Sequence, residues 1–524
     1  MEDSKDRRDK KDKVVSLSDR FLKEEREQRK TTGSQPEYLL EGMDKPAGPS
    51  GPVPDEKTLD AIIKAARGAL EKDPKNMAAH HDLGVAYLEK GLIDQAIPEL
   101  EEAIKLDPRR VSAHYLLGVA RAEKNQLDGA IEAWKQVLKI NPRYGQARYF
   151  IGKVYALKGM WDAAIHEMKK ALDIGPEHPV MYLHLGEVYL AKGELENAAR
   201  YWAKGLSLDP NHLQLHHNLG AVYLDLRLYD RSIQENLRAL ELGSQSPIVV
   251  YNLGVAYLAS GQFAQAEDQL KSYLKLSPQD IAARVNLGEA QAMQGKLAEA
   301  VAAWEEVLKL SPEHPDALYN IALAKVQQGQ GSQRETNLLE AIGLWERVRA
   351  KDPKNINALR NIAVAYALLG RFSESMDRWE ALAQSDPKNP EPRLNLGELL
   401  LRQAQPAQAR PHLQQALSLA PQDSRAHFLV GVASLLTGGS GDKAPDGKAR
   451  GPAPSPSPLL ETLRSWKRAA ELDEDFARKN EGVIQDLIRP QQLQALEAEA
   501  KKQRDSKAEK VLQAVRRYLP ATPH

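Results

Sequence analysis

The sequence predicts an all-α solenoid, a stack of two-helix units, from its period, its helical apolar stripes and its composition. A closing proline recurs every 34 residues, with Ser244 once in its place and one slip of seven residues. Self-similarity at this period is typical of stacked repeat arrays. The closing residues are Pro108, Pro142, Pro176, Pro210, Ser244, Pro278, Pro312, Pro353, Pro387 and Pro421.

Two helices are expected within each unit, and residues 76–108 give the clearest example. Apolar residues at helical spacing mark a first helix around His80–Tyr87. Gly91 interrupts it, and Asp94 is the expected N-cap of a second helix. Pro108 ends that helix because proline cannot continue the helical hydrogen bonding. Since each unit buries its face on its neighbours, such a chain needs no large single core.

The residues within each unit resemble the tetratricopeptide repeat. A Leu-Gly pair is followed by Tyr three residues after the Gly, by Ala in the second helix and by the closing Pro. The pattern returns, for example, as LGEVYLAKGELENAARYW (185–202) and LGVAYLASGQFAQAEDQL (253–270), and ten repeats cover roughly 77–421. The resemblance implies a right-handed superhelix of about eleven helix-turn-helix repeats. It also implies a concave groove, lined by the first helices, in which protein segments bind.

Composition shifts divide the chain into five expected segments. Residues 1–55 form a charged tail and a Pro/Gly linker, both expected to be disordered. Residues 56–75 form an N-terminal capping helix and 76–421 the ten repeats. An eleventh repeat, 422–476, is interrupted by a disordered Gly/Pro/Ser loop at 438–458. Residues 477–524 contain amphipathic helices and a short tail, and these helices either cap the solenoid or contact a partner.

Charge and motifs limit the possible functions. Lys+Arg and Asp+Glu number 72 each, so net charge favours neither nucleic acid nor an anionic membrane as a partner. There is no Cys, and no apolar run approaches the ~18–20 residues of a membrane span. No phosphate loop, nucleophile elbow or metalloprotease motif is present. We therefore expect a cytoplasmic protein that is not an enzyme, uses no cofactor or metal and does not insert into membranes, with its oligomeric state open.

Tryptophan and histidine residues occupy recurring places in the repeat. Six tryptophans share one second-helix position and are therefore expected to pack between helices rather than to bind a ligand. These are Trp134, Trp202, Trp304, Trp345, Trp379 and Trp466. His80, His114, His216 and His427 lie four residues before the Gly of the Leu-Gly pair, which favours a structural role over metal binding.

The residue directly before the Leu-Gly pair is the first candidate for binding. In this family it faces the groove, and in six later repeats it is asparagine. These are Asn218, Asn252, Asn286, Asn320, Asn361 and Asn395. A carboxamide offers donors and an acceptor, so a row of them can hold an extended peptide by its backbone. The row is similar to the asparagine ladder in the repeats of O-linked N-acetylglucosamine transferases. The alternative is that Asn is only the usual residue of the repeat here.

Apolar residues replace asparagine in the earlier repeats. They predict an apolar, aromatic groove for a helix or hydrophobic segment. The residues are Tyr115, Leu116, Val119, Tyr149, Phe150 and Leu183, with Tyr251 and Tyr319 extending the aromatic contacts. The clamp by which some relatives grip a C-terminal carboxylate is not matched, although Arg360, Arg402 and Arg425 are candidates to receive an acidic group.

These observations indicate a non-enzymatic scaffold that binds peptide or helical segments of partner proteins in its groove and assembles a complex. A rigid groove formed in advance leaves most of the ordering cost to the incoming segment. Two alternatives remain open at this point. One is a regulatory subunit that presents substrates to a separate enzyme, and the other is an assembly factor for a bacterial envelope machine such as a pilus or secretion apparatus.

Overall fold

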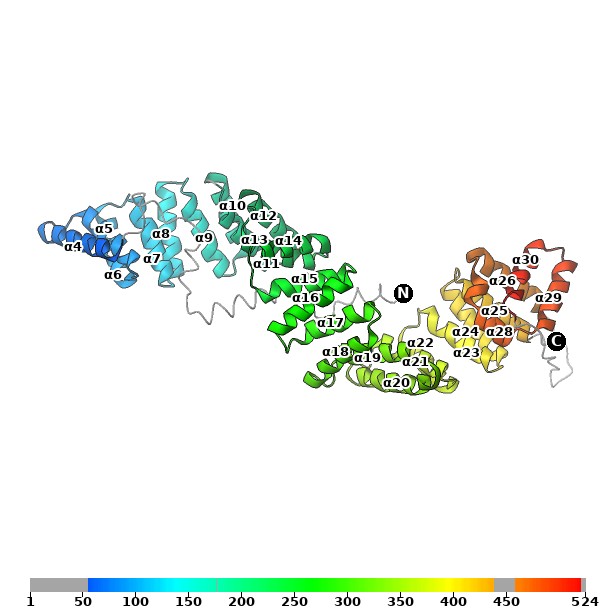
Figure 1. Ribbon diagram of the computed structural model, residues 1–524. Coiled ribbons are helices and arrows are strands. Elements are labelled where there is room, and N and C mark those ends of the chain that lie inside the picture. The colour runs from blue at the N-terminus through cyan, green and yellow to red at the C-terminus, as the bar shows by residue number, and fades with distance from the viewer. Residues whose placement is uncertain (1–54, 176, 438–457, 520–524) are drawn as a thin grey trace. The chain divides into compact units, whose positions relative to one another are not determined.

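The computed structural model describes residues 55–175, 177–437 and 458–519, and all elements in these ranges are helical (Figure 1). The predicted all-α class is therefore confirmed. The charged tail and most of the Gly/Pro/Ser loop lie outside the described residues. Among the described helices, none is long and apolar enough to cross a membrane.

First and second helices alternate along the chain. The first helices are α5 (Met77–Glu89), α7 (Val111–Glu123), α9 (Gly145–Leu157), α11 (Pro179–Ala191), α13 (Leu213–Asp225), α15 (Pro247–Ala259), α17 (Ile281–Met293), α19 (Pro315–Gln328), α21 (Ile356–Leu368), α23 (Pro390–Arg402) and α25 (Ser424–Thr437). The second helices are α6 (Ile93–Leu106), α8 (Leu127–Ile140), α10 (Trp161–Ile174), α12 (Leu195–Leu208), α14 (Tyr229–Glu241), α16 (Phe263–Leu276), α18 (Leu297–Leu310), α20 (Arg334–Lys351), α22 (Phe372–Ser385), α24 (Pro406–Leu419) and α26 (Pro458–Leu472). The remaining elements are α4 (Glu56–Lys72), the 3₁₀ turn η2 (Gly331–Gln333), α27 (Phe476–Lys479), α28 (Glu481–Leu487), α29 (Pro490–Lys502) and α30 (Ser506–Arg516).

The two helices of a repeat meet through its glycine and its large second-helix side chain. The Trp134 indole Nε1 donates a hydrogen bond to the Tyr115 carbonyl oxygen at 3.1 Å. A Cβ atom on Gly118 would lie only 2.3 Å from that nitrogen, so glycine is required for this approach. Trp202 makes the same bond with Leu183, and Trp466 makes it with Phe428. All six tryptophans of this position are at most 3% exposed, which confirms the predicted packing role.

The expectation that Asp94 is the N-cap of the second helix is wrong. Helix α6 begins at Ile93 after Leu92, which makes no side-chain cap bond, so Asp94 lies inside the first turn. Its carboxylate instead pairs with Lys124, the residue that ends the first helix of the next repeat, at 2.6 Å. The same pair recurs as Lys90–Asp60, Lys158–Asp128 and Lys192–Asp162. This aspartate therefore links one repeat to the next.

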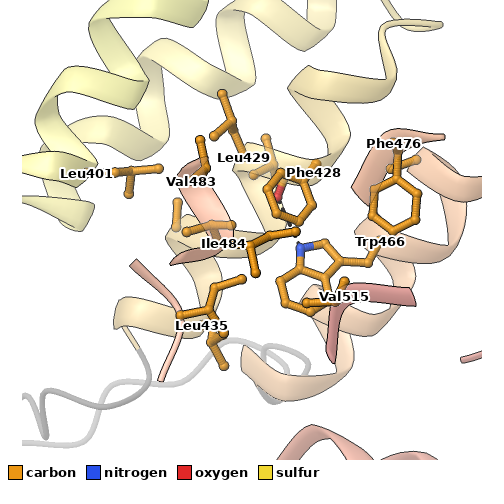
Figure 2. Close-up of a cluster of buried hydrophobic side chains, with 14 of the residues drawn as sticks. Leu401, Phe428, Leu429, Leu435, Trp466, Phe476, Val483, Ile484 and Val515 are labelled. Carbon is orange, nitrogen blue, oxygen red and sulfur yellow. Dashed lines mark hydrogen bonds between the residues drawn. The ribbon is translucent and has the colours of Figure 1, made fainter. Parts of the chain in front are cut away.

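The chain divides into two compact units, residues 1–294 and 295–524. In unit 1, helix α4 packs against α5, and its Leu59 and Ala66 are buried. In unit 2, the C-terminal helices pack around Phe428 and Trp466, whose rings stack with centroids 5.3 Å apart (Figure 2). Because Leu493, Leu496 and Leu512 of α29 and α30 are fully buried in this cluster, their apolar faces belong to the core.

Candidate peptide-binding face

First helices of neighbouring repeats contact one another within each unit, as α13 and α15 do in unit 1 and α23 and α25 in unit 2. Their side chains form a surface that we call the first-helix face. It contains the residues in register with Asn361, Val364 and Leu368 of α21, repeated every 34 residues in α23 and α25. In α25 the equivalent residues are Leu429, Val432 and Leu436.

Part of this face in unit 2 is covered by a segment of the same chain. Helix α27 packs against α25 and helix α28 packs against α23. Val483 and Ile484 of α28 belong to the apolar cluster that contains Leu401 and Leu429 (Figure 2). Val483 is 5% exposed and Ile484 is fully buried. The first-helix face therefore receives a short amphipathic helix by its apolar side.

The three arginines expected to receive a partner's acidic group are already paired within the chain, which corrects that expectation. Arg402 forms ion pairs with Asp486 of α28 and, at 3.1 Å, with Glu398. Arg425 pairs with the same Glu398. The Nε atom of Arg360 lies 3.0 Å from the Glu391 carboxylate. The carboxylates that pair with these arginines thus come from α23 and α28.

Helix α21 presents an uncovered stretch of the face. Val364 is 42% exposed and Leu368 is 47% exposed, and the two residues lie one helical turn apart. Asn361, one turn before Val364, donates from Nδ2 to the Tyr319 hydroxyl at 2.9 Å. The stretch combines two exposed apolar side chains with an adjacent carboxamide.

The six asparagines occupy equivalent places but differ in burial. Asn218 and Asn252 are at most 2% exposed, while Asn286, Asn320, Asn361 and Asn395 are half-buried. The Asn218 Oδ1 atom accepts a hydrogen bond from Gln214 at 2.9 Å. Its Nδ2 atom and both polar side-chain atoms of Asn252 are buried without a hydrogen-bond partner in the described structure. An unpaired buried polar group costs about 1–3 kcal/mol, and a ligand cannot reach these atoms without movement of the helices.

Most of the residues predicted to line an exposed apolar groove are buried, so their expected exposure is corrected. Tyr115, Val119, Tyr149, Phe150, Leu183 and Tyr251 are at most 9% exposed, whereas Leu116 and Tyr319 are half-buried. The Phe150 ring stacks on Trp134 of the preceding repeat, with centroids 5.5 Å apart. The Tyr149 hydroxyl lies 2.6 Å from Nδ1 of His184. Large rings at these places fill the seam between repeats.

The recurring histidines join each first helix to the turn before it. In each case Nε2 lies 3.0–3.1 Å from the carbonyl oxygen of the proline six residues earlier. The pairs are His80–Pro74, His114–Pro108, His216–Pro210 and His427–Pro421. This contact supports the structural interpretation.

His217, on α13 beside Asn218, is not one of these recurring histidines. Burial lowers its pKa to about 4.

Comparison with known families gives the class of protein. One sequence model described as tetratricopeptide repeat matches residues 63–109, 81–134, 251–315, 294–332 and 333–390. A second model with the same description matches 155–221 and 378–431. A model described as TPR repeat matches 120–159. The chain thus has the fold of a protein-interaction scaffold, and no catalytic family is indicated. It belongs to the tetratricopeptide repeat family.

Several solved structures are similar to parts of the chain. MamA is 32% identical over 29% of this chain and 89% of its own, with a TM-score of 0.28. YrrB, titled a TPR protein with an unusual peptide-binding site, is 25% identical over 37% of this chain and 95% of its own, with a TM-score of 0.33. Pseudomonas aeruginosa pilF is 20% identical over 46% of this chain and 99% of its own, with a TM-score of 0.34. No curated protein sequence matches the chain.

Proposed function

We propose that this chain is a non-enzymatic scaffold that holds segments of partner proteins against its first-helix face and so assembles a complex. The observation that carries the proposal is the position of α28, which packs against the first helix α23 and buries Val483 and Ile484 in the apolar cluster of unit 2. A face that receives one short amphipathic helix from the same chain has the shape and polarity to receive another from a partner.

The uncovered stretch of α21 is the proposed contact in unit 2. Its Val364 and Leu368 have the spacing that meets the apolar stripe of an incoming helix. Complete burial of such a side chain is worth about 1.5–3 kcal/mol. Because the helices of the scaffold are already folded, little of this gain is lost to ordering the receiving side.

The asparagine row is proposed to hold the backbone of a bound segment. Asn286, Asn320, Asn361 and Asn395 are the members that a segment can reach, because they are half-buried, whereas Asn218 and Asn252 are at most 2% exposed. In the half-buried part of the row, Asn286 and Asn361 point toward tyrosine hydroxyls of the preceding repeat, which fixes their orientation. The two kinds of contact serve one purpose, with the carboxamides holding the backbone and the apolar residues selecting side chains.

The test is capture of partners from native lysate, with crosslinking to locate the contact. Val364→Asp with Leu368→Asp should reduce capture at least about tenfold, because two apolar contacts are replaced by desolvated carboxylates. Asn361→Ala should weaken capture less, since it removes one carboxamide. Helicity and the thermal midpoint should stay close to those of the wild-type protein, because both apolar residues are exposed.

A matched control places two aspartates on second helices of the same unit. Leu310→Asp with Leu339→Asp changes two side chains of comparable exposure, 45% and 43%, by the same charge. Capture should be unchanged in this control. Equal loss of capture in both double variants, or crosslinks that avoid α21 and its neighbours, would rule out the first-helix face as the binding surface.

A further inference from the structure

A cluster of positive charge lies on the second helices of unit 1, away from the residues that define the first-helix face. Its centre is the Tyr201 ring of α12. Within 6 Å of the centroid of this ring lie three cationic groups, at 5.8 Å for Lys169 Nζ, 5.0 Å for Arg200 Cζ and 5.6 Å for Lys204 Nζ. Three like charges around one ring repel one another, so the arrangement favours a bound anion.

The cations are held in place by a stack of tyrosines. Tyr201 lies parallel to Tyr189 of α11, with centroids 5.2 Å apart and planes inclined by 6°. Tyr182, also of α11, stacks on the same Tyr201 ring with centroids 6.3 Å apart. Lys169 lies over both the Tyr189 and Tyr201 rings, and its interaction with the Tyr189 hydroxyl raises its pKa, so it remains charged. Fixed aromatic surfaces therefore orient charges that would otherwise move freely.

Neighbouring carboxylates do not neutralise this cluster. On α10, Asp162 pairs with Lys192 and Glu167 with Arg148. Asp173, Glu177 and Glu196 are exposed and close in sequence. Across the described residues, however, no ion pair joins any carboxylate to Lys169, Lys170, Arg200 or Lys204. Some lysines elsewhere on second helices are paired, as Lys105 is with Glu102 and Lys135 with Glu132. Among the described residues, the distinguishing feature of the cluster is that three unpaired cations gather around one ring.

We propose that this surface, formed by Lys169, Arg200 and Lys204 around Tyr201, binds an acidic segment of a partner protein. Arg200 and Lys204 are exposed, so a ligand can reach their charged ends. The cluster draws on α10 and α12, and its three cationic groups all lie within 6 Å of one ring centroid, so they are less than about 12 Å from one another. That span fits two or three carboxylates of one short segment better than a long run of nucleic-acid phosphates or a membrane surface. The site is separate from the proposed peptide-binding face and does not depend on it.

Binding of labelled peptides to the full-length protein tests the proposal by fluorescence anisotropy at low and physiological salt. The probe is an eight-residue peptide of alternating Glu and Gly, with a Gln/Gly peptide of equal length as the uncharged comparison. A phosphoserine peptide, a short oligothymidylate and phosphatidylserine vesicles are the competing probes. The Glu peptide should bind, the Gln peptide should not, and added salt should weaken binding by screening.

Arg200→Ser with Lys204→Ser should weaken binding of the Glu peptide about tenfold, because it removes two charge-assisted contacts at an exposed site. The matched control, Lys105→Ser with Lys139→Ser, removes the same charge from exposed positions of α6 and α8 and should change binding less than about twofold. Circular dichroism should show equal helicity in both. Equal weakening by both pairs, absence of Glu-peptide binding, or tighter binding of oligothymidylate or vesicles would overturn the proposal. A phosphoserine peptide that binds tighter than the Glu peptide would keep the site and assign it a phosphorylated acidic segment.

Discussion

At the residue scale, side-chain size decides whether a residue at a given position of the repeat is buried between repeats or stays partly exposed. At the residue before the Leu-Gly pair, the large Phe150 ring turns into the seam and stacks on Trp134, while Asn361 stays half-buried and bonds to Tyr319. A 34-residue register identifies the place but not the direction that a side chain takes from it. The predicted tryptophan packing is confirmed, because an indole is large enough to fill the space beside a small first-helix residue, as Trp134 does against Gly118.

That contact makes a specific prediction for stability. Gly118→Ala should lower the free energy of unfolding by about 1–3 kcal/mol, because the added methyl group overlaps the Trp134 indole in a packed interior. Gly68→Ala is the matched control in the same unit, since a Cβ there meets no atom within 4 Å in the middle of α4. It should leave stability unchanged or raise it by up to about 1 kcal/mol. Urea unfolding followed by circular dichroism measures both, and similar midpoints for the two variants would contradict the packing argument.

Desolvation of the half-buried His217 side chain predicts how stability depends on pH. Its folded-state pKa of about 4 lies below the ordinary value of 6.5, so the unfolded chain takes up the proton first as the pH falls. The contribution is therefore present above about pH 6.5 and is lost progressively toward pH 4, at about 1.4 kcal/mol per pH unit. Compared with His217→Gln, the wild-type protein should lose about 3 kcal/mol more over this interval. Parallel urea titrations of both proteins give the difference, and identical pH dependences would contradict a neutral buried imidazole.

At the element scale, the helices and their alternation could be predicted, but their ends and one short helix could not. The repeat sets helix positions because its apolar stripes and its closing proline recur together. Asp94 was misassigned as a cap, because an aspartate near a helix start satisfies either the backbone or a lysine of the next repeat, and spacing does not distinguish these. Helix α28 is only seven residues long and lies outside the repeat register. The 34-residue period therefore could not predict its contact with the first-helix face.

At the scale of the whole molecule, stability in a stacked array is a sum of contacts between neighbours. The helices of the repeats follow this rule, since within each unit they pack against the helix before and the helix after them. The chain also divides into two compact units, one ending at Gln294 and the other beginning at Gly295. A local loss of packing should therefore remain local and should not lower the stability of distant repeats equally.

Trp466→Ala tests this expectation. The indole is fully buried in unit 2, stacks on Phe428 and donates to its carbonyl oxygen at 3.1 Å. Its removal should cost about 3–5 kcal/mol locally. Amide hydrogen exchange should accelerate in α25, α26 and the C-terminal helices, while exchange in α5 to α12 of unit 1 stays at the wild-type rate. Trp134→Ala is the reciprocal variant and should give the opposite pattern, with faster exchange around α7 to α9 and no change in α25 and α26. If either substitution accelerated exchange to the same degree in both units, the chain would unfold as one cooperative body, and nearest-neighbour packing would not explain its stability.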